Sequence, residues 1–203
     1  MILAIDCSTA ACTAALFGAD GNLLAERHEE IGRGHAERLV PLTAELLGAH
    51  IPSEILVGVG PGSFTGLRVA IAAAHGMAIG WSIPLCGLDS LALLAAGAPL
   101  EGSVAVAMLG GHGEWFVAEY VRPSLHLVRP LANLAPAAAA RAIAAPLVVG
   151  SAAEALVALR GTGQAIPALP RAAHALRLPL ALRTLDPRPV YSRSPDARPR
   201  QAA

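Results

Sequence analysis

The 203-residue sequence contains no lysine, and only 15% of its residues are charged. A P-loop of the GxxxxGK[ST] type needs a lysine for the phosphates of a nucleotide, so this class of site is excluded. The formal net charge is zero. We therefore expect no binding of nucleic acid by this chain alone, because clustered basic side chains hold phosphate backbones. The late arginines are interpreted as a solvated tail, with a nucleic-acid contact inside a larger complex as the alternative: Arg183, Arg188, Arg193, Arg198 and Arg200.

Metal-binding spacings are missing as well. No two of the seven histidines lie three to five residues apart, HExxH is absent, and the three cysteines, Cys7, Cys12 and Cys86, form no CxxC pair. The sequence therefore predicts neither a metal nor a cofactor. An odd cysteine count is typical of reduced thiols, and no basic residue precedes the apolar start, so we expect a cytoplasmic protein. The apolar stretch 69–81 is too short to span a membrane.

What the sequence does have is a high hydrophobic content, 54%, with aromatic residues at only 3%. A chain of this length can bury a core as one large domain or as two small lobes. The first half predicts strands and helices in the order strands 2–6, 12–18 and 23–28, helix 35–47, strand 55–59, helix 66–80. The second half predicts a hairpin of strands 103–109 and 115–121, then strand 125–129, helix 136–144, strand 147–149 and helix 152–160. We expect an α/β fold with a first lobe, 1–100, that carries partner-binding helices, and a smaller second lobe with a tail, 101–203.

The most specific motif is Gly60-Pro61-Gly62-Ser63-Phe64-Thr65-Gly66-Leu67-Arg68. It follows a buried strand and precedes a helix, so it predicts a tight glycine turn at a helix N-terminus, where free N–H groups suit an anion or a capping hydroxyl. Ser63 or Thr65 can provide the cap. A vestigial nucleotide or anion site is one interpretation, made of Asp6, Ser8, Thr9, Gly60, Gly62, Ser63 and Thr65. The other is that Asp6 caps its own turn and that the junction binds nothing.

Two helices carry more apolar or small residues than one core face requires. On the second helix, Ala72, Gly76 and Gly80 are spaced four apart, with Ala73 beside them, and form a strip that lets another helix come close. An internal contact with the sheet is the alternative. The first helix has apolar residues on two sides, and we expect one side to be exposed to a partner. The predicted interface comprises His35, Leu39, Leu42, Leu46, Ala72, Ala73, Gly76 and Gly80. His35 alone is interpreted as a capping or packing residue.

The motif at 60–68 resembles the signature of the TsaB family, also called YeaZ. Further resemblances follow in order along the chain: Ile2–Thr9, Gly34–Leu42, Gly113–Phe116 and Pro189–Ala197. The resemblance implies a two-lobed fold of the actin-like, sugar-kinase-like, Hsp70-like (ASKHA) class with a reduced second lobe. It also implies a non-catalytic subunit that binds and activates a TsaD-like catalytic subunit, which transfers threonylcarbamoyl to an adenosine of tRNA. The paired-histidine metal motif of TsaD has no counterpart at Cys86–Leu93.

The resemblance further implies a TsaE-like ATPase as a partner, a second copy of the chain as an alternative partner, and tRNA contact only through the complex. One departure stands in the middle hairpin, where Leu109-Gly110-Gly111 replaces an Asp-Ala-Arg type sequence. This departure weakens any claim that the hairpin binds a ligand. The competing hypothesis is a stand-alone nucleotide-binding enzyme of the kinase-like fold, which would act through Asp6, Ser8 and the turn 60–66.

Overall fold

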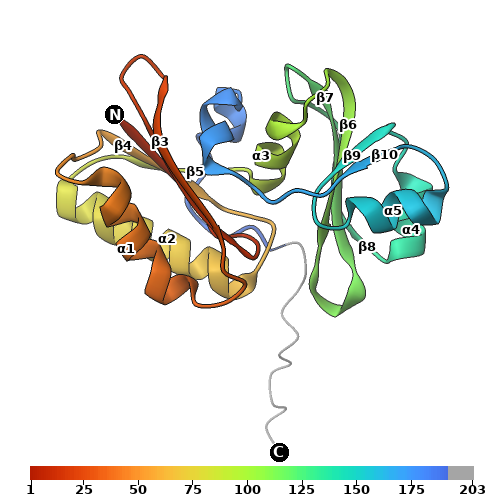
Figure 1. Cartoon of the computed structure of the whole chain (residues 1–203), viewed down its shortest axis with the longest axis horizontal. Coiled ribbons are helices and arrows are strands. Elements are labelled where there is room, and N and C mark those ends of the chain that lie inside the picture. The colour runs from red at the N-terminus through yellow and green to blue at the C-terminus, as the bar shows by residue number, and fades with distance from the viewer. Residues whose placement is uncertain (192–203) are drawn as a thin grey trace, which may run out of the picture.

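The computed structural model describes residues 1–191 and contains two five-stranded sheets, with one short helix, α3 (Ser90–Gly97), between them (Figure 1). The first sheet has the order β3-β2-β1-β4-β5. Its strands are β1 (Ile2–Asp6), β2 (Ala11–Phe17), β3 (Leu23–Glu30), β4 (Glu54–Gly58) and β5 (Leu85–Leu88). β1, β2 and β3 form an antiparallel meander, and β4 and β5 extend the sheet in parallel with β1.

Two helices, α1 (His35–Leu47) and α2 (Phe64–Trp81), cover one face of the first sheet (Figure 1). α1 has the predicted bounds, and Gly48 ends it with a positive φ of 56°. α2 begins at the glycine turn, where the Ser63 hydroxyl accepts a hydrogen bond from the Gly66 N–H at 3.2 Å. The prediction that Ser63 can cap this helix is confirmed.

The second sheet repeats the plan of the first at smaller scale, with the order β10-β9-β6-β7-β8. Its strands are β6 (Gly102–Leu109), β7 (Trp115–Arg122), β8 (His126–Leu134), β9 (Leu147–Val149) and β10 (Gln164–Ile166). Again three antiparallel strands are followed by two parallel ones, with helices α4 (Pro136–Ala142) and α5 (Ala153–Arg160) in the connections. This identical strand order confirms the predicted two-lobed α/β class with a reduced second lobe.

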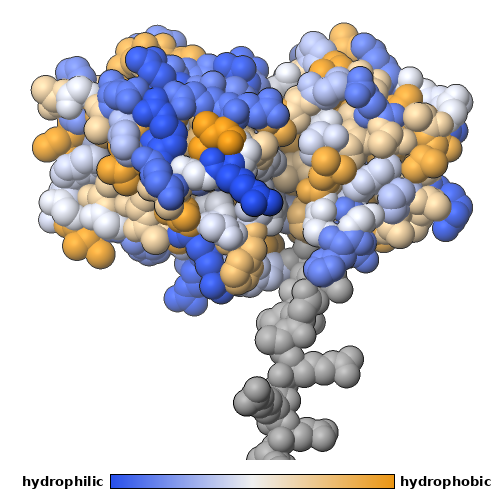
Figure 2. All heavy atoms as spheres, turned by 60° about the horizontal axis from the view of Figure 1, so that its bottom comes forward, coloured by the Kyte–Doolittle hydropathy of each residue, from blue (hydrophilic) through white to orange (hydrophobic). Residues whose placement is uncertain are grey.

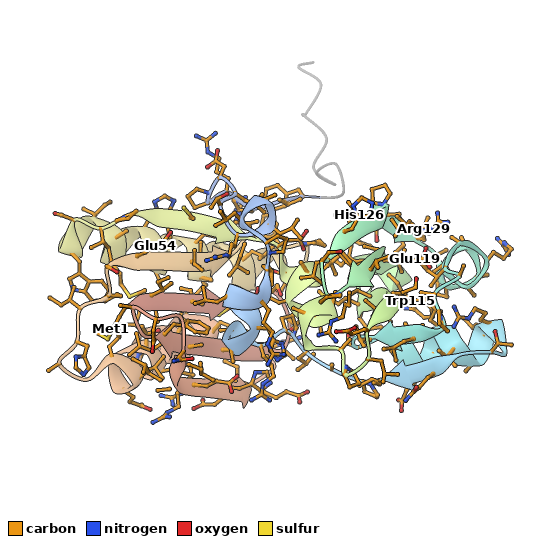
Figure 3. The ribbon with its side chains drawn as sticks, turned by 90° about the horizontal axis from the view of Figure 1, so that it is seen from above. Met1, Glu54, Trp115, Glu119, His126 and Arg129 are labelled. Carbon is orange, nitrogen blue, oxygen red and sulfur yellow. The ribbon has the colours of Figure 1, made fainter. Side chains whose placement is uncertain are left out.

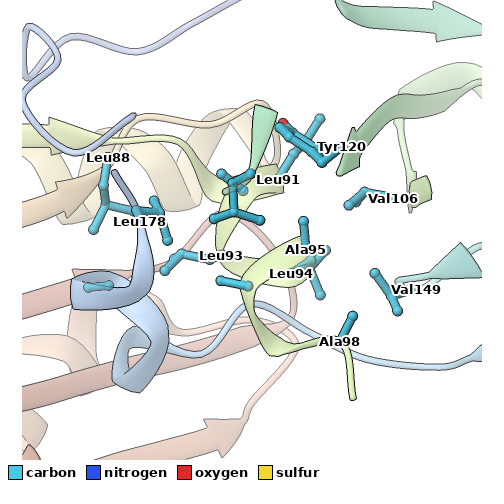
Figure 4. Close-up of a cluster of buried hydrophobic side chains, with 14 of the residues drawn as sticks. Leu88, Leu91, Leu93, Leu94, Ala95, Ala98, Val106, Tyr120, Val149 and Leu178 are labelled. Atoms are coloured by element: carbon cyan, nitrogen blue, oxygen red, sulfur yellow. The ribbon is translucent and has the colours of Figure 1, made fainter. Parts of the chain in front are cut away.

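A single hydrophobic core passes from one sheet to the other through α3. Seven of the eight residues of α3 are buried. The apolar side chains among them pack with Leu56 of the first sheet, and with Val106 and Tyr120 of the second, both of which Figure 4 labels. α3 is therefore apolar on all sides. A helix without a polar face has no amphipathic period, which explains why the sequence pattern did not reveal it. β5 and β10 were missed because runs of four and three residues are too short to show alternation.

The chain returns to the first sheet after β10. The 3-10 helix η2 (Ala172–Arg177) packs on the sheet face opposite α1 and α2, and the Ala172 N–H donates to Thr13 Oγ1 at 3.1 Å. Arg171 binds Glu26 of β3 through two hydrogen bonds of 3.0 and 2.8 Å. Further on, Leu185 pairs with Gly87 of β5. Residues predicted for the second lobe thus lie against the first, and the proposed division after residue 100 stays a prediction.

Within the second lobe, Glu119 of β7 is buried and holds the end of α4 in place. Its Oε1 accepts hydrogen bonds from the N–H groups of Ala144 and Ala145, at 2.7 and 2.8 Å. Its Oε2 accepts one from Arg129 of β8 at 3.2 Å, and Figure 3 labels both side chains on neighbouring strands. This carboxylate is a structural support that no motif in the sequence indicates.

Candidate functional site

The glycine turn 60–66 lies at the carboxyl end of β4, next to the end of β1. Gly60 has a φ of +102°, which favours glycine. A Cβ at Gly62 would collide with the Ser8 backbone, and one at Gly66 would collide with the Cys7 carbonyl. The glycines are therefore required for close packing of two turns, whether or not a ligand binds. The Ser63 N–H donates to the Ser8 carbonyl at 2.7 Å and closes this contact.

Asp6 is buried at the centre of this arrangement, and both of its carboxylate oxygens accept hydrogen bonds. Oδ1 accepts from the Ser8 N–H at 2.8 Å and from the Ser8 hydroxyl at 2.6 Å. Oδ2 accepts from the Ser90 hydroxyl at 2.6 Å, and Ser90 Oγ in turn accepts from the Gly60 N–H at 3.1 Å. Burial raises the pKa of Asp6, against the lowering effect of these bonds. Asp6 therefore ties β1 to the glycine turn and to the start of α3.

A cleft of about 550 Å³ opens between the lobes above this network. Ser8, Thr9, Gly62 and Ser63 line it on the first lobe, and Leu109 and Ser151 are among the residues that line it on the second. Of the predicted nucleotide or anion residues, these four reach the cleft, whereas Asp6 and Gly60 lie beneath it, and Thr65 is an exposed residue of the first turn of α2. The cleft includes one acid, Glu30, and among residues 1–191 no basic side chain lines it.

The second candidate region is the outer face of α2. Ala72, Gly76 and Gly80 are exposed, and Ala73 is partly buried. Apart from the neighbouring residues and the backbone of α2 itself, no heavy atom lies within 4 Å of where a Cβ would stand at Gly76 or Gly80. Two exposed apolar side chains add to this surface on the helix pair: Ile79 of α2 is 76% exposed and Val40 of α1 is 54% exposed. Figure 2 brings this side of the molecule forward and shows hydrophobic residues interrupting the polar surface. We call this surface the α2 strip.

The interface predicted on α1 needs a correction. Leu39, Leu42 and Leu46 are between 0 and 7% exposed, and His35 is 7% exposed, so none of the four is available to a partner. The reason is that α1 packs against both β2 and α2, and its leucines belong to the core cluster between them, whereas Val40 stays exposed. His35 Nε2 lies 3.3 Å from the Ala11 carbonyl, as a packing residue would.

Three residues that sequence reasoning did not assign to a site lie at the start of α2. The Arg68 guanidinium stacks on the Phe64 ring at 3.8 Å from its centroid, and Arg68 Nε donates to the Tyr191 hydroxyl at 3.0 Å. The contact spans 123 positions in sequence, so no local pattern could have revealed it. Ser90 was missed for the same reason, because 84 residues separate it from Asp6.

Metal sites and membrane-spanning helices are both missing from residues 1–191. No group of three or more histidine, cysteine, aspartate or glutamate side chains is placed to hold a metal ion there. In the same residues, no helix combines the length and the apolar character that crossing a bilayer requires. Of the late arginines, Arg193, Arg198 and Arg200 lie outside the described residues, as does most of the C-terminal motif 189–197. Arg183 is partly buried, and Arg188 is exposed and forms an ion pair of 3.3 Å with Asp186, so the interpretation as a solvated tail stays a prediction.

Comparisons with known proteins identify the family. The family model for TsaD, tRNA N6-adenosine threonylcarbamoyltransferase, matches residues 25–172. The structure is similar to YeaZ from Pseudomonas aeruginosa, with a TM-score of 0.77 and 27% identity, over 94% of this chain and 98% of that one. The chain belongs to the TsaB (YeaZ) family, within the wider family of that model.

Two curated TsaB proteins agree with this assignment. The tRNA threonylcarbamoyladenosine biosynthesis protein TsaB of Escherichia coli is 37% identical over 129 residues, 60% of this chain and 55% of that protein. The protein of the same name from Haemophilus influenzae is 35% identical over 101 residues, 46% of this chain and 41% of that protein. The chain thus spans about half the length of the curated relatives it matches. The family predicted from the motifs at 2–9 and 60–68 is confirmed.

Proposed function

We propose that this chain is a non-catalytic subunit of a tRNA N6-threonylcarbamoyladenosine transferase, and that it binds a TsaD-type catalytic subunit through α2. Membership of the TsaB family supports the pathway, because the TsaB relatives carry threonylcarbamoyladenosine biosynthesis in their names. The observation that carries the binding role is the α2 strip. It is a helix face of small residues with open space above it.

The chemistry of the strip favours a helix as the partner element. Interaxial distances between packed helices are about 8–10 Å and depend on the side chains at the contact, so glycine and alanine permit the closest approach. The exposed Ile79 and Val40 add apolar area, which a partner would remove from water. A TsaD-type subunit is the proposed occupant. A second copy of the chain competes for the same face, while a TsaE-type ATPase and tRNA join through the complex.

The non-catalytic part of the proposal is supported by the state of Asp6. In a phosphotransferase, a carboxylate at this place would face a metal–phosphate group. Here its two oxygens are occupied by the hydroxyls of Ser8 and Ser90 and by a backbone N–H. The carboxylate is 1% exposed, so it is turned into the protein rather than into the cleft.

The decisive experiment measures association after a side chain is enlarged on the strip. Gly76→Leu and Ala72→Leu should each weaken binding to a TsaD-type subunit by roughly 5- to 150-fold, because overpacking costs about 1–3 kcal/mol. Ala158→Leu on the exposed side of α5 is the matched control, since it adds the same apolar side chain to another exposed helix. Equal affinities for Ala72→Leu and Ala158→Leu would contradict the proposal.

The same preparations test the competing enzyme hypothesis. The purified chain should show no turnover of nucleotide, and transferase activity should require the added TsaD-type subunit. Hydrolysis of ATP by the isolated chain that Asp6→Asn abolishes would favour the stand-alone enzyme instead. Activity that is lost in Gly76→Leu but regained at high subunit concentration would support the binding role.

A further inference from the structure

Cys7 and Cys12 lie side by side where β1 and β2 part. The antiparallel register pairs Ile5 with Ala14 and Asp6 with Thr13, so the next pair in this register is Cys7 with Cys12. Both thiols belong to the core cluster under α1 and α2, hence to the same face of the sheet. Their sulfur atoms are 3.9 Å apart, and neither residue is exposed.

This placement meets the geometric requirements of a disulfide. Opposed residues in antiparallel strands have Cα atoms about 4.5–5.5 Å apart, which lies inside the range of about 4.4–6.8 Å found across disulfides. A disulfide bond is about 2.05 Å long, so the two sulfurs must approach by roughly 1.9 Å from their present distance of 3.9 Å. All three cysteines are free thiols in this structure, and Cys86, on β5, is the partly exposed one.

We propose that Cys7 and Cys12 form a reversible intramolecular disulfide by exchange with a small disulfide oxidant of the glutathione class. One cysteine, as the thiolate, attacks a sulfur of the oxidant and releases the first reduced thiol. The other cysteine, as the thiolate, then attacks the cysteine sulfur of this mixed disulfide, breaks its S–S bond and releases the second reduced thiol. Two electrons pass from the cysteine pair to the oxidant, and the two cysteine protons go to the two thiolates that leave.

Local opening at the start of α1 provides the access that exchange requires. In the closed structure, the contact with Cys12 and burial raise the pKa of Cys7, which keeps this thiol protonated and unreactive. α1 begins after Gly34 without any side-chain cap, and its first residue, His35, lies on the Ala11 carbonyl. An uncapped first turn opens at lower free energy than the helix interior, and its opening uncovers the end of the hairpin.

The disulfide would close a loop around residues 8–11, the turn that carries Ser8 and Thr9 into the cleft. It would also fix the position of Asp6, the residue before Cys7. The proposal therefore couples the thiol–disulfide state of the cell to the rigidity of the cleft. It does not depend on the proposed binding function, because the α2 strip is a separate surface.

The experiment uses the full chain, incubated with oxidised glutathione, then denatured and alkylated. No lysine or arginine lies between Cys7 and Cys12, so trypsin leaves both in one peptide that ends at Arg27. We expect this peptide to carry no alkyl groups and to be lighter than the reduced, unalkylated peptide by two hydrogen atoms. Treatment with a thiol reductant before alkylation should restore both alkylation sites. Cys86 is the control for both reagents. Glutathione on Cys86 shows that the oxidant reacted, and an alkyl group on the remaining Cys86 shows that the alkylating agent reacted.

Variants separate the disulfide from other oxidation products. Cys7→Ser should give a peptide with one alkyl or glutathione group on Cys12 and no loss of two hydrogen atoms, whereas Cys86→Ser should behave as the natural chain. Amide hydrogen exchange at residues 8–11 should slow on oxidation in the natural chain and not in Cys7→Ser. Two results would overturn the proposal. One is full alkylation of Cys7 and Cys12 in a sample whose Cys86 has reacted with glutathione. The other is a stable glutathione adduct on Cys12 alone in the natural chain.

Discussion

The two sheets share one strand order, but the helices that cover them differ greatly in length. α1 and α2 have 13 and 18 residues, whereas their counterparts α4 and α5 have 7 and 8. At 1.5 Å per residue, α2 offers a face about 27 Å long and α5 one of about 12 Å. A stable protein–protein interface needs roughly 800 Å² from each partner. Among the described residues, the helices of the first lobe therefore offer the longer faces, although both sheets have the same strand order.

The residues that end the equivalent strands β1 and β6 differ in burial and in polarity. β1 ends at Asp6, which is 1% exposed and fully hydrogen-bonded, while β6 ends at Leu109, which is 60% exposed. Both ends border the cleft region. The first lobe therefore carries a buried carboxyl group at this position, and the second lobe carries an exposed apolar side chain.

The test with the largest expected effect asks whether the two lobes unfold together in one cooperative transition. Leu91→Ala, in the core that α3 shares with both sheets, should lower the free energy of unfolding by about 2–5 kcal/mol. Trp81 and Trp115 are the only two tryptophans, one in each lobe, so Trp115→Phe and Trp81→Phe backgrounds report the lobes separately. We expect one transition, with the same shift from both probes.

Leu159→Ala, at a residue 58% exposed on α5, is the control and should change the free energy of unfolding by less than about 0.5 kcal/mol. Two transitions, of which Leu91→Ala moves only one, would show that the lobes unfold independently. The shared core would then be a contact between domains rather than a single cooperative unit.

The second test concerns the buried carboxyl group of Asp6 in the first lobe. A carboxyl whose pKa is raised by folding destabilises the protein once the unfolded chain has lost its proton and the folded chain has not. As pH rises through the usual aspartate value, about 3.9, and up to the pKa in the folded protein, the natural chain should lose stability relative to Asp6→Asn. Each unit of pKa difference corresponds to about 1.4 kcal/mol.

Urea unfolding of both proteins at a series of pH values measures this difference, and the titration of all other groups cancels to first order. A difference that stays constant across the acidic range, or that changes in favour of the natural chain as pH rises, would mean that hydrogen bonds from Ser8 and Ser90 outweigh burial.

The smallest expected change in stability comes from replacing a glycine by alanine, and it should have opposite signs at two glycines, one in each lobe. Gly76→Ala should stabilise the isolated chain by about 0.5–1 kcal/mol, because the helix position is open and alanine is the better helix former. Gly150→Ala should destabilise it, because the φ of Gly150 is +126° and the new Cβ would meet the Ala107 backbone. Thermal melts should show shifts of opposite sign, of a few degrees. A loss of stability in Gly76→Ala would place this side of α2 in an internal contact.

Much of the fold could be predicted from the sequence, because α1 and α2 are long helices, Gly34 and Gly48 flank α1, and the glycine turn 60–66 separates β4 from the body of α2. α3 could not, since burial on all sides removes the alternation of apolar and polar residues that marks a helix. The candidate site was predicted only in part. Asp6, Ser8, Gly60, Gly62 and Ser63 do come together, but Ser90 completes the network from a helix that was not recognised.

The predicted interface shows a different limit of sequence reasoning. Apolar residues on two sides of α1 indicated an exposed face, but the predicted interface residues of α1 are all buried, because α1 packs on both β2 and α2. Residue type alone does not distinguish a neighbouring helix of the same chain from a partner. The small residues of α2 were placed on the surface by the structure, which shows open space at Gly76 and Gly80.

The return of residues 172–191 to the first sheet has a consequence for synthesis on the ribosome. β1, β2 and β3 are made before the second sheet, yet one of their faces is covered by η2, and β5 receives its partner Leu185 only after the second sheet has been made. Until then the first sheet presents an uncovered apolar face and an unpaired edge, the features that promote aggregation of nascent chains. The first sheet is thus completed only after the second sheet has been synthesised.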